Sequence, residues 1–434
     1  MITNLPNDLM EDILSRVPIE RMRAVRLTCT KWNTLSNSPI FAKMHIDKAF
    51  DPAKEDESES RIIVLMEENL YLLSVFVNVN VYDVIIDFSV EQTGKLTCLD
   101  EQVKISNVYH CDGLLLCILE DVATRVVVWN PYLGQTRWIQ LRSSHVVPWG
   151  LGFHNVSRYG IGYEDKGPGR NHKILRFIDV FLMEDGYKFL WYEIYDFESG
   201  LWTTLDVTEP HWRITHGDGV SVKGNTYWCA RERDAEGWNG RRDYIKHIIC
   251  FDYTRKRFGP LLPLPSEYTY AHVTLSCVRE EKLAALCNSD ENDDYWFEIW
   301  ITTRIEAGKV SWSKFFTFNP NSLPHDSLFS FSGFYIDQVK KVVMFSGKRL
   351  NYHTVCIVNE EGEYQGEVAI GNLTEEKWWR SSLCPYVPSL VQVKGGRREK
   401  QSDLENFRYD EMMSRLTLFL WRCKKLGRNC SIST

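Results

Sequence analysis

A motif that recurs every 52 to 59 residues constrains the fold more than any other feature of this 434-residue chain. In each copy a hairpin leads to a strand that ends in a polar turn, and an aromatic residue follows. The hairpin turns lie near Gly113, Asp165, Gly224, Glu281 and Gln338, so the successive offsets are 52, 59, 57 and 57 residues. One four-stranded sheet cannot bury both of its faces, whereas sheets repeated around a ring cover one another. The repeat therefore predicts a β-propeller.

The closing strands of the five copies share an apolar run and a turn. They are residues 127–134, 193–200, 249–256, 298–301 and 356–362, which lead to Trp138, Trp202, Phe258, Trp312 and Tyr364. Further strands over 62–88 bring the number of units to about six. We expect an all-β, six-bladed, kelch-like propeller over residues 61–393, with a pair of β-sandwiches as the alternative.

The remaining segments have a different character. Residues 1–48 predict three short helices, with Val17-Pro18 ending the first and a second over 19–24. Residues 49–60 are acidic and poor in strand formers, which is typical of a linker. Residues 394–434 carry 10 basic against 5 acidic side chains, so this tail is +5 and the rest of the chain −12.

The tail predicts an amphipathic helix, because its apolar residues have helical spacing. They are Leu404, Phe407, Met412, Leu416, Phe419, Leu420 and Cys423. We expect this helix to dock on the body of the protein, and a membrane-surface or partner-binding helix is the alternative. The short basic cluster over residues 394–400 leaves a nuclear signal open.

Composition excludes several classes of protein. The formal charge of −7 argues against nucleic-acid partners, and no run of about 18 apolar residues predicts a membrane span. The 12 cysteines include no C-x-x-C pair, and the N-terminus does not resemble a secretory signal. We expect an intracellular protein of the nucleus, the cytoplasm or both, with no metal and no cofactor.

The N-terminal helices resemble an F-box. Residues 5–18 (LPNDLMEDILSRVP) look like its opening half, and residues 26–35 (RLTCTKWNTL) look like its closing half. Met22 stands where a leucine is common in the family. About 45 residues build only a marginal core, so apolar side chains here suit docking on another protein. The adaptor-binding residues that the resemblance implies are Leu5, Pro6, Leu9, Ile13, Leu14, Val17, Pro18, Val25, Leu27, Cys29, Trp32 and Leu35.

The β region resembles the F-box-associated domain, type 1, of the large plant F-box family. The matching segments are residues 111–117 (CDGLLLC), 129–131 (WNP), 159–163 (YGIGY), 193–196 (EIYD), 224–228 (GNTYW) and 249–252 (ICFD). The resemblance implies the substrate receptor of a Skp–cullin–F-box ubiquitin ligase. Its F-box would dock on a Skp-type adaptor, and through it on a cullin scaffold. The β domain would hold a target protein, whose identity is unknown.

The sequence carries no sign of catalysis by this chain. A nucleophile elbow, a zinc-protease motif, a P-loop and a dinucleotide fingerprint are all missing. His211 and His216 do not have metal-ligand spacing for a strand, and the acidic residues over 290–294 predict a solvated hairpin tip. A propeller glycosidase and a peptide- or sugar-binding propeller without a ligase role are the alternative functions.

The target-binding face is expected on loops of the propeller. Four loops have unusual content, namely residues 143–149, 209–218, 231–242 and 289–294. Trp149, Trp212 and Trp238 are the candidate target-binding anchors, because tryptophan is enriched at interface hot spots. Each could equally pack beneath its own loop.

Overall fold

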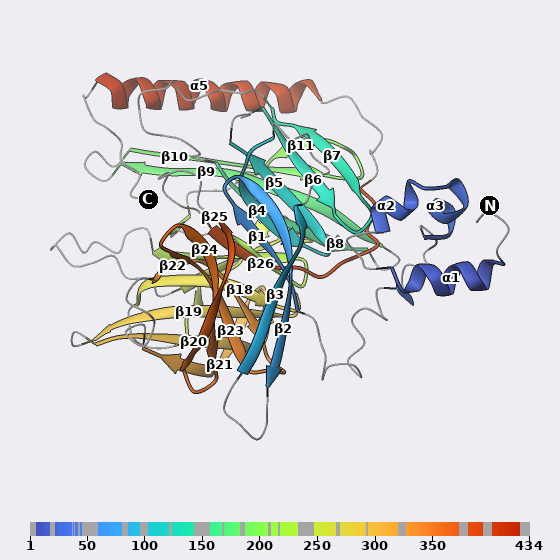
Figure 1. The fold of residues 1–434 in the computed structure, drawn as a ribbon. Coiled ribbons are helices and arrows are strands. Elements are labelled where there is room, and N and C mark those ends of the chain that lie inside the picture. Colours follow the sequence, from blue (N-terminus) through green and yellow to red (C-terminus); the bar gives the residue numbers. More distant parts are fainter. Residues whose placement is uncertain are drawn as a thin grey trace. The chain divides into compact units, whose positions relative to one another are not determined.

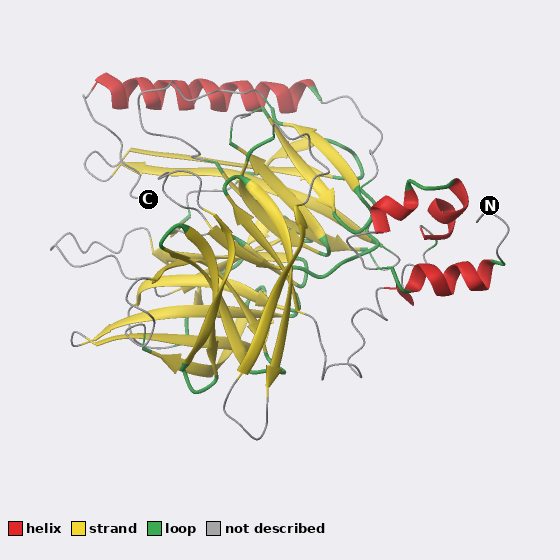
Figure 2. Ribbon diagram, in the orientation of Figure 1, coloured by secondary structure: helices red, strands yellow, loops and turns green. Residues whose placement is uncertain are grey.

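The structure is a computed structural model of the chain. The residues it describes are 6–17, 22–36, 38, 40–41, 44–45, 60–79, 86–95, 103–120, 124–142, 157–166, 169–182, 187–206, 210–215, 218–232, 247–265, 270–291, 294–319, 327–372, 381–393 and 402–425. Three short helices come first, antiparallel sheets follow, and a long helix ends the described chain (Figures 1 and 2).

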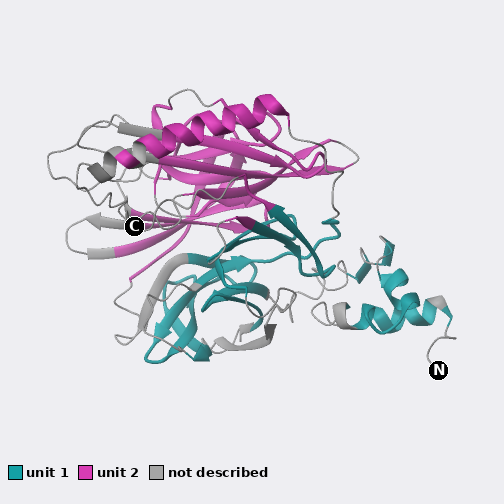
Figure 3. Cartoon of the chain, turned by 90° about the horizontal axis from the view of Figure 1, so that it is seen from above, with its two compact units in different colours: residues 1–121, 126–139, 321–394 teal, residues 122–125, 140–320, 395–434 magenta. Residues whose placement is uncertain are grey.

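The chain divides into two compact units, which Figure 3 shows in teal and magenta. The first comprises residues 1–121, 126–139 and 321–394, and the second residues 122–125, 140–320 and 395–434. Within the described residues each unit holds three separate antiparallel sheets. The prediction of an all-β body of six sheets is therefore confirmed, and two-sheet sandwiches do not account for it.

The first unit contains helices α1 (Asn7–Ser15), α2 (Met22–Arg26) and α3 (Thr30–Ser36). One of its sheets has the order β26-β1-β2-β3, with bounds Ser381–Pro385, Ser60–Met66, Asn69–Val79 and Ile86–Lys95. A second runs β4-β5-β6-β7, with bounds Ile105–Cys111, Leu114–Leu119, Arg125–Asn130 and Gln135–Gln140. The third runs β22-β23-β24-β25, with bounds Ser327–Asp337, Val342–Arg349, Tyr352–Asn359 and Tyr364–Asn372.

The second unit contains helix α5 (Asp403–Lys425). One sheet has the order β11-β10-β9-β8, with bounds Trp202–Thr204, Tyr187–Asp196, Arg170–Leu182 and Arg158–Asp165. Another runs β18-β19-β20-β21, with bounds Tyr270–Val278, Lys282–Glu291, Asp294–Glu306 and Lys309–Phe318. The remaining sheet holds β12 (Trp212–Ile214), β13 (Val220–Val222), β14 (Asn225–Glu232), β15 (His247–Asp252), β16 (Arg257–Phe258) and β17 (Leu262–Pro263).

The six strands of this last sheet occupy four strand positions. Both β12 and β13 pair with β14, and both β16 and β17 pair with β15. The outer position is interrupted at Gly259 and Pro260, where proline cannot donate a ladder hydrogen bond. This sheet therefore keeps the four strand positions that the sequence predicts for each repeat.

The predicted turns lie where strands reverse. Asp112 and Gly113 join β4 to β5 with φ of 53° and 71°, and Lys223 and Gly224 join β13 to β14 with 50° and 78°. Two consecutive left-handed residues form the turn that matches the twist of a two-residue hairpin. A Cβ at Gly113 would also collide with the side chain of Ser389, so glycine is required there.

Neighbouring sheets pack face to face within each unit. In the first unit, Val64 and Val75 of one sheet and Met344 and Ile357 of another belong to one buried cluster. In the second unit, a cluster rich in aromatic residues joins β9 and β10 to β14 and β15. This packing explains strands such as β5, whose residues are buried on both faces.

The last strand of the β region completes the first sheet. In β26, Leu383 and Cys384 pair with Val64 and Ile63 of β1, although more than 300 positions separate them. Pairing with β26 covers an edge of β1 that would otherwise expose its backbone groups.

Helices α1, α2, α3 and α5 lie in the segments for which the sequence predicts helices, and their ends differ from the predicted ones. Residues 40–41 and 44–45 are helical as well. The second helix, predicted over 19–24, is described from Met22 to Arg26, and residues 18–21 lie outside the described residues. The predicted tail helix is α5. No helix in the described part of the chain has the length and apolar composition to cross a membrane.

Candidate functional site

The N-terminal helices enclose a small apolar core. Met10, Leu14, Met22 and Phe41 are fully buried in this region. Five of the predicted adaptor-binding residues take part in the core, with Leu14 at its centre and the others packed against it: Val17, Val25, Trp32 and Leu35. Leu14 is fully buried in this core, whereas the other four side chains are only partly buried.

Other predicted residues lie at the surface. Leu27 is 80% exposed, Leu9 is 45% exposed and Pro6 is also exposed. Ile13 and Cys29 are partly buried, and Leu5 and Pro18 lie outside the described residues. Leu9 and Ile13 are four residues apart on α1 and therefore share a face. The predicted set thus separates into a core group and a surface group.

Sequence reasoning missed two members of the exposed group. Ile40 is 84% exposed, and Met44 is also exposed. The neighbour of Ile40, Phe41, is almost completely buried. Two adjacent apolar residues give no signal of which one faces the core, because their orientation depends on how the segment packs.

The turn between β6 and β7 contacts the N-terminal helical region within the first unit. The Arg26 side chain donates to the Tyr132 carbonyl at 2.5 Å, and its guanidinium lies 5.1 Å from the centre of the Tyr132 ring. His45 Nδ1 lies 3.0 Å from the Tyr132 hydroxyl. Burial raises the pKa of Tyr132 to about 12, so its hydroxyl is protonated at neutral pH.

The same turn is fixed on its other side. Asn130, from the predicted Trp-Asn-Pro segment, is fully buried. Its amide donates to the carbonyls of Ser389 and Val391 at 3.0 and 2.8 Å, and its Oδ1 accepts from the Leu133 N–H at 2.9 Å. A buried asparagine whose amide groups are bonded in this way holds the turn in one conformation.

The structure describes only one of the three proposed target anchors. Trp149 and Trp238 lie outside the described residues. Trp212 was expected on a loop, but it begins β12, is only 5% exposed and packs on Phe258 with ring centres 4.6 Å apart. Its neighbours are those of a core cluster of the second unit. For Trp212 the structure therefore corrects the loop assignment, because a buried indole cannot serve as an exposed anchor.

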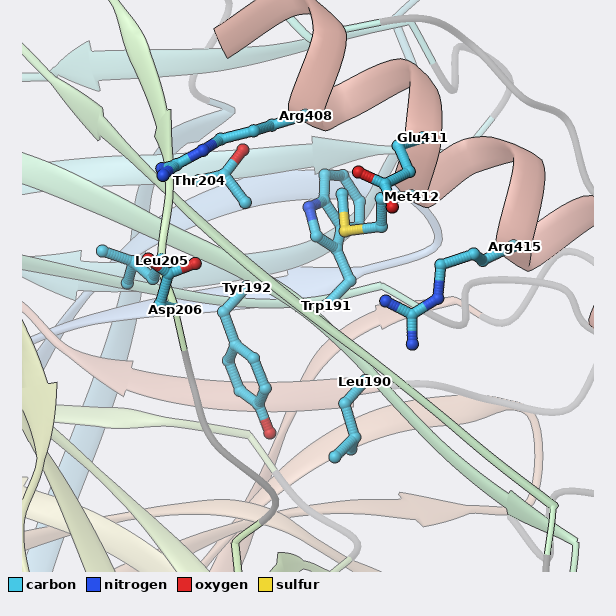
Figure 4. A pocket seen from close by; sticks show the side chains of 10 residues that line it. All are labelled: Leu190, Trp191, Tyr192, Thr204, Leu205, Asp206, Arg408, Glu411, Met412 and Arg415. Carbon is cyan, nitrogen blue, oxygen red and sulfur yellow. The ribbon is translucent and has the colours of Figure 1, made fainter. Parts of the chain in front are cut away.

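A groove of about 300 Å³ lies between α5 and the sheet β8–β11 in the second unit (Figure 4). Trp191 and Tyr192 of β10 lie on the sheet side, and both are almost completely buried. Charged side chains line the groove as well, and they are Asp206, Arg408, Glu411 and Arg415. Two acidic and two basic groups give this lining no net charge.

Helix α5 is docked by specific contacts. Glu405 Oε2 accepts from the Thr204 N–H at 3.0 Å and lies 3.5 Å from Arg142 Nη2. The Tyr409 hydroxyl donates to the Arg142 carbonyl at 2.6 Å. Met413 and Leu416 are buried on the same helix. Of the alternatives for the tail, docking on the body is the one that the structure shows.

A buried charge cluster lies beneath this helix. Glu193, in the predicted Glu-Ile-Tyr-Asp segment, is completely buried and accepts from Arg176 at 3.2 Å. Arg142 lies 3.9 Å from its other oxygen. Burial raises the pKa of Glu193 to about 7, against the opposing effect of the two arginines. The arrangement resembles a structural ion cluster more than an acid–base pair, because it is closed to solvent.

The described residues contain no group of three or more His, Cys, Asp and Glu side chains placed to hold a metal ion. His211 is exposed, and His216 lies outside the described residues. At the acidic tip, Glu291 pairs with Asp294 across the hairpin of β19 and β20.

Comparisons with known proteins agree with these features. A family model for the F-box domain matches residues 2–44, and one for the F-box-associated β-propeller domain matches residues 61–393. The F-box/kelch-repeat protein At4g33290 of Arabidopsis thaliana is 49% identical over 432 residues, covering 95% of each chain. The F-box protein At2g38590 of the same plant is 48% identical over 444 residues, covering 98% of this chain and 99% of its own. Among solved structures, TolB from Acinetobacter baumannii aligns with 80% of this chain and 73% of its own, at 11% identity and a TM-score of 0.39.

Proposed function

Because the chain belongs to the family of F-box proteins with an F-box-associated β-propeller domain, we propose that it is the substrate receptor of a Skp–cullin–F-box ubiquitin ligase. Its F-box helices would dock on a Skp-type adaptor, which links it to a cullin scaffold. The β region would hold a target protein. The chain would act in the nucleus, the cytoplasm or both.

The exposed apolar side chains of the F-box are the observation that carries this proposal. Pro6, Leu9, Leu27, Ile40 and Met44 remain exposed beside a core that is already closed by other residues. Burial of one such leucine on a partner contributes about 1.5–3 kcal/mol before the entropic cost of association. A helical region that exposes these groups is suited to a partner that covers them.

In this proposal the chain brings the target close to ubiquitin and does not itself make or break covalent bonds. A receptor that holds a target lysine near an activated ubiquitin raises the effective concentration of the two reactants. This role needs no nucleophile and no cofactor on the receptor. The charges around Glu193 are closed to solvent, and Arg142 of this cluster contacts Glu405 of α5.

Co-purification with a Skp-type adaptor tests the proposal. The Leu27→Ser variant should lose most of the adaptor retained by the wild type. The matched control is Leu404→Ser, because Leu404 is 63% exposed but lies on α5. Both substitutions are at the surface, so both variants should keep the wild-type melting temperature within a few degrees.

Two results would contradict the proposal. One is a folded wild-type chain that retains no Skp-type adaptor, and the other is equal retention by Leu27→Ser, Leu9→Ser and wild type. A propeller binding module without a ligase role would then be the better account.

A further inference from the structure

We infer that Tyr132 is a positioning residue, which fixes the F-box helices in one orientation against the sheet β4–β7. The inference rests on the proposed function, because it assigns a fixed direction to the helices that would bind the adaptor. Tyr132 is fully buried, and its turn is braced through Asn130. Its partners in the F-box region are Arg26 and His45.

Hydrogen bonds hold both ring nitrogens of His45. His45 Nε2 lies 2.8 Å from the Val17 carbonyl, and a carbonyl can only accept, so Nε2 donates. In the neutral form of the ring, Nδ1 accepts from the Tyr132 hydroxyl. Both ring nitrogens are therefore satisfied while His45 is almost completely buried. Stacking on Phe41, with ring centres 5.7 Å apart, fixes the plane of the imidazole.

Two side chains connect Tyr132 to all three helices. His45 reaches the carbonyl of Val17, just beyond the end of α1. Arg26 lies on α2, and it also donates to the side chain and carbonyl of Ser36 on α3, at 3.2 and 3.3 Å. The helices are thus tied to each other by the same groups that tie them to the sheet.

Separation of the helices from the sheet would be unfavourable for specific reasons. It would expose the Tyr132 ring and remove one of the acceptors of the buried Arg26 guanidinium. The covalent connection of the chain alone would then permit many orientations. The contacts at Tyr132 select one of them.

Distance measurements between two fluorescent labels on the full-length chain test the inference. Because the chain has 12 cysteines, the labels are attached to unnatural amino acids at two exposed positions, Thr34 on α3 and Glu120 after β5. The wild type should show one narrow distance distribution. Tyr132→Ala should broaden it, and the Arg26→Gln, Tyr132→Phe double variant should broaden it without creating a large cavity.

A control separates positioning from general loss of stability. Phe334 is fully buried in the sheet β22–β25 and contacts Phe345, so Phe334→Ala should lower the melting temperature and leave the distribution narrow. Tyr132→Phe alone removes only the hydroxyl and should give an intermediate width. If Tyr132→Ala does not fold, the double variant decides the question.

The distance measurement and the adaptor-binding measurement can each fail without the other. A broad distribution in the wild type, or a narrow one in the folded double variant, would overturn the positioning role of Tyr132. Tyr132→Ala and Tyr132→Phe should retain a Skp-type adaptor as the wild type does, because they change no residue of the helices that carry Leu9 and Leu27. Absence of adaptor from every sample, including the wild type, would refute the proposed function and leave the distance result standing.

Discussion

The Glu405 carboxylate accepts a hydrogen bond from the backbone N–H of Thr204 at 3.0 Å, so a side chain of α5 occupies the edge of β11. An edge strand normally offers such groups to solvent or to other chains. Arg142 reinforces the arrangement, because it contacts both Glu405 and the carbonyl of Trp202. The tail helix and the sheet β8–β11 therefore form a single packed element.

Removal of this carboxylate should loosen α5. We expect Glu405→Ala to lower the free energy of unfolding of the protein by about 1–3 kcal/mol, because a charged hydrogen bond is lost. Glu405→Gln should cost less, since its amide oxygen can still accept from Thr204. Faster hydrogen exchange at residues 202–205 is the direct measurement. Glu411→Ala, on an exposed part of the same helix, is the control and should leave this exchange unchanged.

The buried Glu193 should make stability depend on pH. Its pKa is about 7 in the folded protein, above its ordinary value of 4.5, so the folded state binds the proton more tightly. The free energy of unfolding should therefore fall as the pH rises from about 4.5 to 7. Glu193→Gln cannot titrate, so relative to the wild type it should gain up to about 3 kcal/mol between pH 5 and 8. Urea denaturation across this range measures the difference.

A matched variant serves as the control for this measurement. Glu198→Gln changes an exposed carboxylate of the same unit and should follow the wild-type pH profile. If the free energy of unfolding of Glu193→Gln changes with pH in parallel with that of the wild type, the buried Glu193 does not control stability in this pH range.

Asp196 should have the opposite pH dependence. Burial alone would raise its pKa, but hydrogen bonds from Lys173 and the Ser199 N–H lower it to about 2. The contribution of the ionised Asp196 side chain to the free energy of unfolding is therefore complete above about pH 4, and it is lost as the pH falls toward 2. We expect Asp196→Asn to cost about 2 kcal/mol at pH 7 and to be nearly neutral at pH 2. Asp206→Asn, at an exposed carboxylate, is the control, and its effect on stability should not change in this way with pH. If Asp196→Asn costs the same at both pH values, the lowered pKa of Asp196 is contradicted.

Trp212 should behave as a core residue. Trp212→Ala should lower the free energy of unfolding by about 3–5 kcal/mol, because it leaves a cavity against Phe258. Trp138→Ala, at a tryptophan that is 38% exposed, should cost about 1 kcal/mol or less. Thermal denaturation of the two variants distinguishes them. Similar small losses in both would restore Trp212 as a candidate surface anchor.

The local features of the fold could be predicted because local chemistry determines them. The turn predicted near Gly113 is found at Asp112-Gly113, where glycine tolerates φ of 71°. The spacing of Leu404 and Leu416 predicted a helix that the structure shows as α5. In each case the signal lies within a few residues of the element that it specifies.

The candidate site could be predicted only in part. The F-box motif located the helices, but it did not separate buried Leu14 from exposed Leu27, since both are leucines of one motif. The partners of Tyr132 are 87 and 106 residues away in the chain. Trp212 was mistaken for a loop residue because β12 has only three residues, too few for the alternation of buried and exposed side chains to reveal a strand. Contacts between distant segments decided these cases.

The pairing of β26 with β1 has a consequence for synthesis in the cell. At about 5–20 residues per second, a ribosome needs roughly 15 seconds to a minute to pass from Met66 to Pro385. Throughout that interval β1 has no β26 to pair with, and its edge is open to other nascent chains. The sheet β26-β1-β2-β3 can form completely only when the β region is almost fully translated. We therefore expect nascent chains that end shortly before Ser381 to need chaperones most.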